Sequence, residues 1–144
     1  MLQSEADRLL NLEKFSIDNE PHEFPDLGGN IQIPLQCGQR RESFLLDISR
    51  KCIVLTSKFQ MRARQTIVLA RLDFGATHRN PDGAEVGTPH LHLYREGYAD
   101  KYAYELTGKL AFLKNSQDSW QSITDFMQFC SIVKKPVITR GLFS

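Results

Sequence analysis

The sequence predicts a single α+β domain over residues 1–144, built on one antiparallel β-sheet of about five or more strands that could be strongly curved. Three observations predict this fold. One long segment alternates apolar and polar residues at period two, and several β-rich runs follow one another without crossover helices between them. Apolar residues at helical spacing occur only near the two ends of the chain.

An N-terminal helix is predicted near residues 4–14. Ser4 is a typical N-cap residue, and Glu5 places an acid in the first turn, where the helix dipole favours negative charge. Ala6 and Leu9 follow with helical spacing. The prolines and glycines between residues 21 and 29 then prevent any continuation of this helix.

The clearest predicted strand runs from residue 53 to residue 64. Its alternation places one set of residues on the buried face: Ile53, Leu55, Phe59 and Met61. Other strands are predicted at residues 31–35, 44–48, 66–74, 90–95 and 98–106, with a last short one at 137–139. The segment 75–89 is expected to be a loop, with a tight turn at Asn80–Gly83.

A second, amphipathic helix is predicted near the C-terminus. Ser116 or Asp118 is expected to cap it, and Trp120, Ile123 and Phe126 keep helical spacing on one face. We expect both helices to pack on the sheet.

Composition indicates an ordinary globular protein, with 41% hydrophobic and 24% charged residues. No apolar run approaches the roughly 18–20 residues that span a bilayer, and the first residues do not resemble a secretion signal. The three cysteines, Cys37, Cys52 and Cys130, are widely spaced, which favours reduced thiols and excludes a zinc ribbon. We therefore expect a cytoplasmic protein that does not contact membranes.

Charge is unevenly distributed, although the formal net charge is only +1. Residues 1–30 contain seven acids and two bases, a net charge of −5, whereas residues 40–79 contain nine bases and three acids, a net charge of +6. This asymmetry indicates either an anionic partner for the middle segment or an acidic arm that covers it. Two solvated faces would give the same pattern.

The basic residues of the middle segment predict a phosphate-binding surface. Arginine binds oxyanions through two parallel hydrogen bonds, and period-two spacing aligns such side chains along a strand. Gln60 falls on the same polar face. The candidate nucleic-acid-binding residues are Lys58, Arg62, Arg64, Arg71 and Arg79. The alternative explanation is that these basic residues only keep an exposed strand from aggregating.

A group of histidines is the second candidate site. His90 and His92 share one face of their predicted strand with Tyr94, and the preceding loop delivers His78. Metal-independent cleavage of RNA needs a general base, a general acid and a cation, and histidine titrates near neutrality. The candidate catalytic residues are therefore His78, His90, His92 and Tyr94. Histidines that simply pack within the sheet are an equally good explanation.

A metal site competes for the same residues. His90, His92 and Glu96 have the His-x-His-x-x-x-Glu spacing by which cupin proteins present metal ligands, but the rest of the cupin pattern is missing. Glu96-Gly97 also has the composition of a hairpin turn, which would carry Glu96 away. We therefore expect no metal or cofactor, while a metal-dependent enzyme that uses this His-x-His strand stays an alternative.

Three segments in the middle third of the chain belong together: Arg62–Asp73, the Asn80–Gly83 turn, and the string His-Leu-His-Leu-Tyr-Arg-Glu-Gly that begins at His90. On these segments the chain resembles an uncharacterised family of small bacterial and prophage proteins. The resemblance implies an association with mobile elements, and hence a toxin, an anti-defence factor or an accessory nuclease.

Together these features favour a small RNA-binding protein of a bacterial mobile element, with RNA cleavage as its candidate activity and RNA or a host nucleoprotein as its partner. The alternative is a non-enzymatic phage or prophage inhibitor of a host defence protein. In that case the acidic N-terminal segment would be the surface that binds the protein partner.

Overall fold

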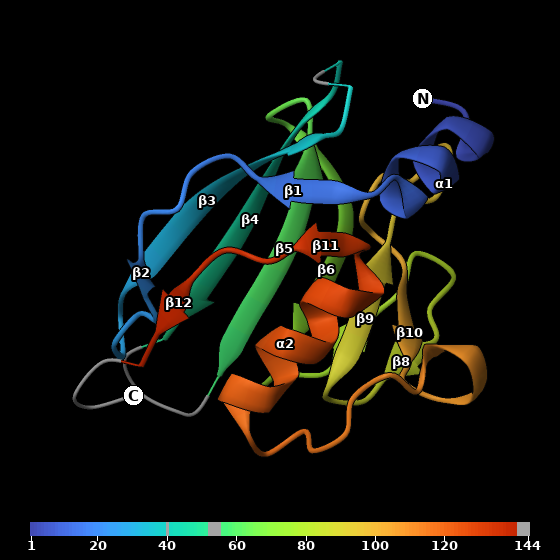
Figure 1. Ribbon diagram of the computed structural model, residues 1–144. Coiled ribbons are helices and arrows are strands. Elements are labelled where there is room, and N and C mark those ends of the chain that lie inside the picture. Colours follow the sequence, from blue (N-terminus) through green and yellow to red (C-terminus); the bar gives the residue numbers. More distant parts are fainter. Residues whose placement is uncertain (40, 52–55, 141–144) are drawn as a thin grey trace.

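The structure is a computed structural model that describes residues 1–39, 41–51 and 56–140 (Figure 1). Its helical elements are α1 (Gln3–Asn11), the 3-10 turn η1 (Gly108–Leu110) and α2 (Ser119–Phe129). The main sheet consists of β1 (Lys14–Ser16), β3 (Asn30–Cys37), β4 (Ser43–Arg50), β5 (Ser57–Ala63), β6 (Ile67–Asp73), β9 (His90–Leu93), β10 (Ala103–Glu105) and β11 (Ile132–Lys134). Two small ladders join β2 (His22–Glu23) to β12 (Ile138–Thr139) and β7 (His78–Arg79) to β8 (Glu85–Val86).

Within the described residues the main sheet has eight strands in the order β10-β9-β6-β5-β4-β3-β1-β11. The prediction of a mixed α+β fold with a large sheet is confirmed, and neighbouring strands from β10 to β1 are antiparallel. The prediction of a purely antiparallel sheet is wrong, because β11 runs parallel to β1 and β12 runs parallel to β2. The cause is non-local: β11 follows α2, which crosses the sheet and returns the chain beside a strand from the other end of the sequence.

The first helix is shorter than predicted, because α1 ends at Asn11 and Lys14 already begins β1. The Lys14 side chain is fully buried. Its ammonium group donates to the carbonyl oxygens of Leu10, Leu12 and Cys130 at 2.8, 2.9 and 2.8 Å. Burial lowers the pKa of Lys14 to about 8. This lysine therefore ties the end of α1 to the end of α2.

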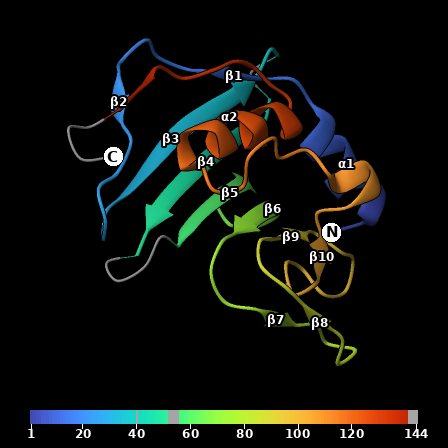
Figure 2. The ribbon, with the colours of Figure 1, turned by 90° about the horizontal axis from the view of Figure 1, so that it is seen from below.

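The second helix begins as predicted after Asp118, whose Oδ1 accepts hydrogen bonds from the backbone N–H groups of Trp120 and Gln121 at 3.0 and 3.2 Å. It lies across one face of the sheet, and the sheet curves around it (Figures 1 and 2). Phe126 of α2 is fully buried, and its ring centroid lies 6.2 Å from that of Phe59 on β5. This contact is at the centre of the hydrophobic core.

The longest predicted strand is confirmed over its second half. Phe59 and Met61 of β5 are fully buried against the core, as predicted. Ile53 and Leu55 lie outside the described residues. The strand ends before Arg64, because Arg64 and Gln65 adopt positive φ angles of 53° and 69° in the turn to β6.

Among the described residues, no helix combines the length and the apolar character needed to cross a membrane.

Candidate metal centre

The face of the sheet turned away from α2 carries polar side chains in rows that cross the strands. Strand pairing places two sets side by side: Lys58, Asp73 and His90 in one row, and Gln60, Arg71 and His92 in the next. Because side chains alternate between the two faces of a strand, the residues between them, such as Leu72 and Leu91, enter the core. The β7–β8 ladder lies beneath β9 on this polar side (Figure 2).

One carboxylate on this face is fully hydrogen-bonded. Asp47 of β4 accepts from Arg62 Nε at 2.6 Å, from Arg62 Nη2 at 2.8 Å and from Gln60 Nε2 at 3.0 Å. We call these three residues the Asp47 cluster. The Arg62 guanidinium also donates through Nη1 to the Gln65 carbonyl oxygen at 2.7 Å. Its charge is therefore matched inside the protein.

The other arginines predicted to bind phosphate are also held by acids. Arg64 binds Glu42 and Glu5 at 2.6 and 2.9 Å. The closest ion pairs of the remaining two are Arg71 with Asp100 at 2.6 Å and Arg79 with Glu85 at 2.7 Å. Lys58 differs, because it is exposed and forms no ion pair within the described part of the chain. Nucleic-acid binding by these residues stays a prediction, and it would require the arginines to exchange their present partners.

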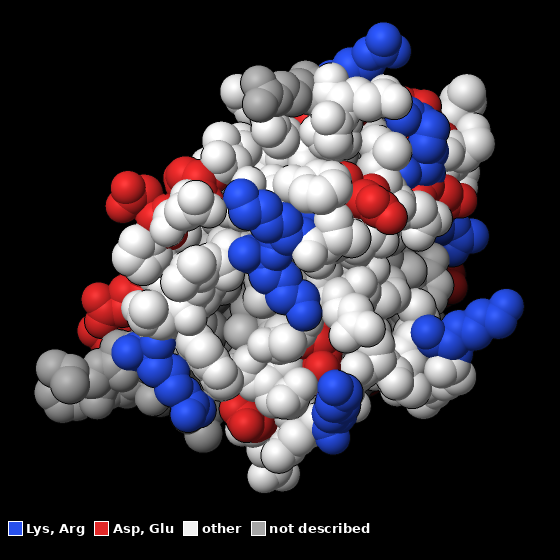
Figure 3. All heavy atoms as spheres, in the orientation of Figure 1, with Lys and Arg blue, Asp and Glu red and all other residues white. Residues whose placement is uncertain are grey.

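On the face of the molecule that carries α2, basic side chains stand in separate places with acidic side chains among them (Figure 3). This pattern provides no continuous basic track on that face. A phosphate-binding surface would therefore have to use the opposite, polar face of the sheet.

His90 and His92 lie on the same side of β9, as predicted, but both are buried, with 2% and 1% of their surface exposed. His90 Nδ1 lies 3.1 Å from the Gly87 carbonyl oxygen, and His92 Nδ1 lies 2.8 Å from that of Asp100. Because a carbonyl oxygen can only accept a hydrogen bond, each Nδ1 carries the proton. In a neutral ring the Nε2 atom therefore carries no proton and offers its lone pair as an acceptor.

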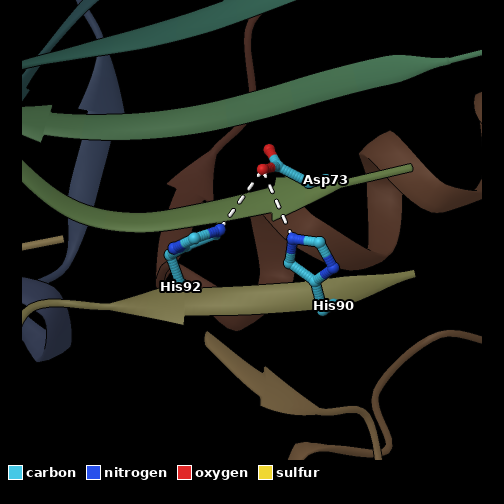
Figure 4. Close-up of side chains that lie close together, drawn as sticks. All are labelled: Asp73, His90 and His92. Carbon is cyan, nitrogen blue, oxygen red and sulfur yellow. Dashed lines mark ion pairs between the residues drawn. The ribbon is translucent and has the colours of Figure 1, made fainter. Parts of the chain in front are cut away.

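Both Nε2 atoms face the carboxylate of Asp73 (Figure 4). Asp73 Oδ2 lies 3.5 Å from His90 Nε2 and 3.3 Å from His92 Nε2. These distances exceed the roughly 2.7–2.9 Å of a charge-assisted hydrogen bond. Among the described residues, His92 Nε2 and Asp73 Oδ1 are buried without a hydrogen-bond partner. We call these residues the Asp73 cluster (Asp73, His90 and His92).

The electrostatics of the Asp73 cluster favour positive charge at its centre. Burial opposes ionisation of Asp73, but the hydrogen bonds that His90 and His92 can donate when protonated, together with the charges of Arg71 and Lys58, outweigh it. They hold the pKa of the Asp73 carboxyl well below its usual range. Three acceptor atoms that converge in a buried place need either protons or a cation between them.

Two of the three separations between the candidate ligand atoms fit a bound metal ion. One ligand atom from each residue of the Asp73 cluster lies within 4.8 Å of the other two. A tetrahedral ion bound at about 2.0–2.1 Å would separate its ligand atoms by roughly 3.3 Å, which agrees with the 3.3 and 3.5 Å measured from Asp73 Oδ2. A histidine that binds a metal through one ring nitrogen typically donates the N–H of its other ring nitrogen to a carbonyl or carboxylate oxygen. Two histidines and one carboxylate suit iron or zinc.

The segment 75–89 closes over the cluster and brings His78 to it. The His78 ring is half-buried, with its centroid 4.6 Å from that of His92, and its Nε2 donates to the Lys101 carbonyl at 2.8 Å. The side chain of Asn80 anchors the segment: it accepts from Ala103 N–H at 2.8 Å and donates to Ala103 C=O at 3.0 Å. The predicted approach of His78 to His90 and His92 is thus what the structure shows.

Two residues considered with the histidines lie elsewhere. Tyr94 follows β9, and its hydroxyl donates to the Met1 carbonyl at 3.2 Å, so its ring packs beside α1 instead of joining His90. Glu96 accepts from the Gln3 backbone N–H at 2.8 Å, which removes it as a ligand. The predicted turn at Glu96-Gly97 explains this displacement.

A small pocket opens beside the Asp73 cluster. Its volume is about 180 Å³, and its lining includes Asp73, His90, His78 and Lys58. A ligand in this pocket would therefore lie against two of the three candidate metal ligands. Cys130, by contrast, is fully buried, and burial raises the pKa of its thiol to about 12, so it is not an available nucleophile.

Asp73 is the member of the site that sequence reasoning missed. It lies in the strand predicted at residues 66–74, two residues from Arg71, and nothing in the local sequence marked it as part of a site. Its contact with His90 depends on the pairing of β6 with β9 across the whole of segment 75–89. An acid at the end of the strand before a His-x-His strand was the available signal.

Fold and site together define this chain as a small α+β protein with an open, mixed sheet and a candidate centre of two histidines and one aspartate. The chain belongs to the family of unknown function DUF6978, whose model matches residues 1–132. This confirms membership of a family without an assigned function; the bacterial or prophage origin stays a prediction. No curated protein and no solved structure matches the chain.

Proposed function

We propose that this protein binds a divalent transition-metal ion at the Asp73 cluster and is a metal-dependent enzyme. One observation carries the proposal. His92 Nε2 is buried, faces Asp73 at 3.3 Å and has no hydrogen-bond partner among the described residues, while its Nδ1 is fixed on the Asp100 carbonyl. An orphaned lone pair costs free energy in a buried site unless something positive binds it.

The pocket supports catalysis beyond simple metal storage. Asp73 and His90 are in its lining, so coordination positions directed toward the pocket would be open to a substrate or to water. A bound ion would supply Lewis acidity and lower the pKa of a coordinated water. His78 is half-buried at the same pocket and is the candidate proton carrier.

The test is metal binding itself. Elemental analysis of the purified protein should find a transition metal in about one-to-one ratio, and calorimetric titration of chelator-treated protein should show one zinc site. His92→Ala and Asp73→Ala should weaken binding by more than the roughly 10–100-fold that losing only an outer hydrogen-bond partner costs.

His22→Ala is a matched control for these variants. His22 also has a buried Nε2 without a hydrogen-bond partner, but its nearest acid is Asp18 at 3.6 Å and it lies far from the Asp73 cluster in sequence. We expect this variant to bind zinc as the wild type does. Equal zinc affinity in wild type and His92→Ala, or no zinc binding at all, would contradict the proposal.

RNA binding is the second candidate, and it is supported by the net charge of residues 40–79 and by Lys58, which forms no ion pair in the described part of the chain. RNA affinity should then fall with salt with a slope of about −0.7 per phosphate neutralised. Direct proton transfer from His90 or His92 to RNA would require segment 75–89 to open, because both rings are buried. Lack of RNA binding at low salt would end this candidate.

Inhibition of a host defence protein stays a prediction that rests on the acidic residues 1–30. Reversing the charges of Glu5, Asp7 and Glu13 should abolish such binding, whereas a metal-dependent activity should tolerate the change. Glu5 is already engaged by Arg8 at 2.7 Å and by Arg64 at 2.9 Å, so the double mutant Asp7→Lys, Glu13→Lys is the cleaner variant.

A further inference from the structure

The pocket beside the Asp73 cluster has a charged wall that metal binding alone does not explain. Lys58 on β5 lies opposite Asp73 on β6 in the register of the two strands, and both residues are in the pocket lining. Asp73 forms its arginine contact with Arg71 at 3.3 Å, and Lys58 remains outside the ion pairs of the described residues. An exposed ammonium group thus lies at the pocket beside the candidate metal ligands.

Lys58 contrasts with the arginines around it. Arg62, Arg64, Arg71 and Arg79 each have an acid within 2.9 Å. Lysine offers a flexible point charge with three donors, whereas the guanidinium groups of these arginines already donate to carboxylates. The charge that remains available to a ligand is therefore concentrated at Lys58, with Lys51 as a second lysine of the same pocket.

We infer that this pocket binds the phosphate group of a small substrate, held between the metal ion and the ammonium group of Lys58. The inference rests on the metal site proposed above. One phosphate oxygen would face the side of Asp73 and His90, and another would accept from Lys58 Nζ. The lining also provides hydroxyl donors from Ser49, Ser57 and Thr77.

Charge balance favours phosphate over carboxylate. A divalent ion with one carboxylate and two neutral imidazoles carries a net charge of about +1, and Lys58 and Lys51 raise the local sum to about +3. A phosphate monoester carries about −1.5 to −2 at neutral pH and therefore matches more of this charge than a carboxylate, which carries only one negative charge.

Size favours a small molecule. A volume of about 180 Å³ is below the roughly 300–1,000 Å³ of pockets that enclose drug-sized ligands. It accommodates a phosphate group with a small organic substituent, while a longer ligand would have to extend out of the pocket. The phosphate group is the part of the substrate whose recognition the pocket determines.

The experiment measures binding of inorganic phosphate to the full chain by calorimetry, with and without bound zinc. Zinc-loaded wild type should bind phosphate, and Lys58→Gln should weaken this binding about 10–100-fold, the effect of losing one charge-assisted hydrogen bond. Lys58→Arg should restore most of the affinity. Lys109→Gln is the matched control: Lys109 is also an exposed lysine but lies outside the pocket lining, so phosphate affinity should not change.

Zinc affinity, measured first in every variant, separates this inference from the metal site on which it rests. If zinc binds but phosphate does not, or if Lys58→Gln binds phosphate as well as wild type, the inference is overturned and the metal site stands. If acetate binds as tightly as phosphate, the assignment to phosphate is overturned. If zinc does not bind wild type, the proposed function fails and the inference fails with it.

Discussion

Two aspartates on the same face of the same sheet have equally exposed side chains and opposite surroundings. The side chains of Asp47 and Asp73 are each 18% exposed. Asp47 accepts three hydrogen bonds of 2.6–3.0 Å from Arg62 and Gln60. Asp73 instead faces the imidazole Nε2 atoms at 3.3 and 3.5 Å and accepts one long hydrogen bond of 3.4 Å from Arg71 Nε on its Oδ2. Its Oδ1 has no hydrogen-bond partner in the described part of the chain.

Asp47 has the surroundings of a structural carboxylate, whereas Asp73 has those of a candidate metal ligand. The Asp47 cluster is complete without any external group, because each charge has its partner within hydrogen-bond distance. The Asp73 cluster becomes complete only when a proton or a cation enters it. Burial and charge alone do not distinguish the two aspartates, whereas hydrogen-bond satisfaction does.

The largest expected effect is stabilisation by metal. Zinc at about 100 times its dissociation constant should raise the free energy of unfolding of wild type by about 2.7 kcal/mol. His92→Ala should lose this gain, because it lacks a ligand, and Asp47→Asn should keep it. Urea unfolding with and without zinc measures both. A zinc effect in His92→Ala equal to that in wild type would remove the distinction between the two clusters.

The second expected effect concerns the stability of the metal-free protein. Asp47→Asn should cost about 1–3 kcal/mol of stability, because it weakens hydrogen bonds to a charged partner. Asp73→Asn should cost less, because the side chain of Asp73 accepts only the long hydrogen bond of 3.4 Å from Arg71 Nε among the described residues, in place of three shorter ones. Chemical denaturation of the two variants under the same conditions tests this order. An equal or larger cost for Asp73→Asn would show that Asp73 is structural as well.

The third effect is a pH dependence at Asp73 itself. Because its pKa is depressed in the folded protein, the ionised carboxylate contributes stability that is present above about pH 4 and is lost as pH falls. The difference in stability between metal-free wild type and Asp73→Asn should therefore shrink between about pH 6 and pH 3. Chemical denaturation of both proteins across this range measures it, and a difference that does not change with pH would contradict the prediction.

The smallest effect is expected at the exposed ion pairs of Arg64. The pKa of Glu5 is lowered to about 2 by hydrogen bonds from Arg8 and Arg64. The stabilisation it contributes is complete above about pH 4.5 and is lost as pH falls toward 2. Arg64→Gln should raise the pKa of Glu5, observable by NMR titration of its carboxyl carbon. Stability at neutral pH should change little, because exposed ion pairs contribute little.

Sequence reasoning was sufficient where the determinants were local. Period-two alternation placed Phe59 in the core and set His90 and His92 on one side of their strand, and the capping chemistry of Asp118 marked the start of α2. It failed where distant segments meet. The acids that pair with Arg64 and Arg71 include Glu5 and Asp100, which are 59 and 29 residues away.

The same limit explains the errors in topology and in the site. The parallel pairing of β11 with β1 joins the two ends of the chain, and no local pattern records it. Asp73 lies in the site because it is paired with His90 in the β6–β9 ladder. Tyr94 lies outside the site because β9 ends at the preceding residue, Leu93. Alternation predicts which face a residue occupies, but it does not predict which strand lies beside it.

The hydrogen bonds between Asn80 and Ala103 also bear on how the protein avoids unwanted assembly. Strand β10 is the last strand at its side of the sheet, and an exposed strand edge can recruit another chain. The Asn80 side-chain amide takes both the N–H and the C=O of Ala103, as a neighbouring strand would. An incoming strand would first have to displace it. A single asparagine thus holds the segment over the histidines and blocks extension of the sheet at that edge.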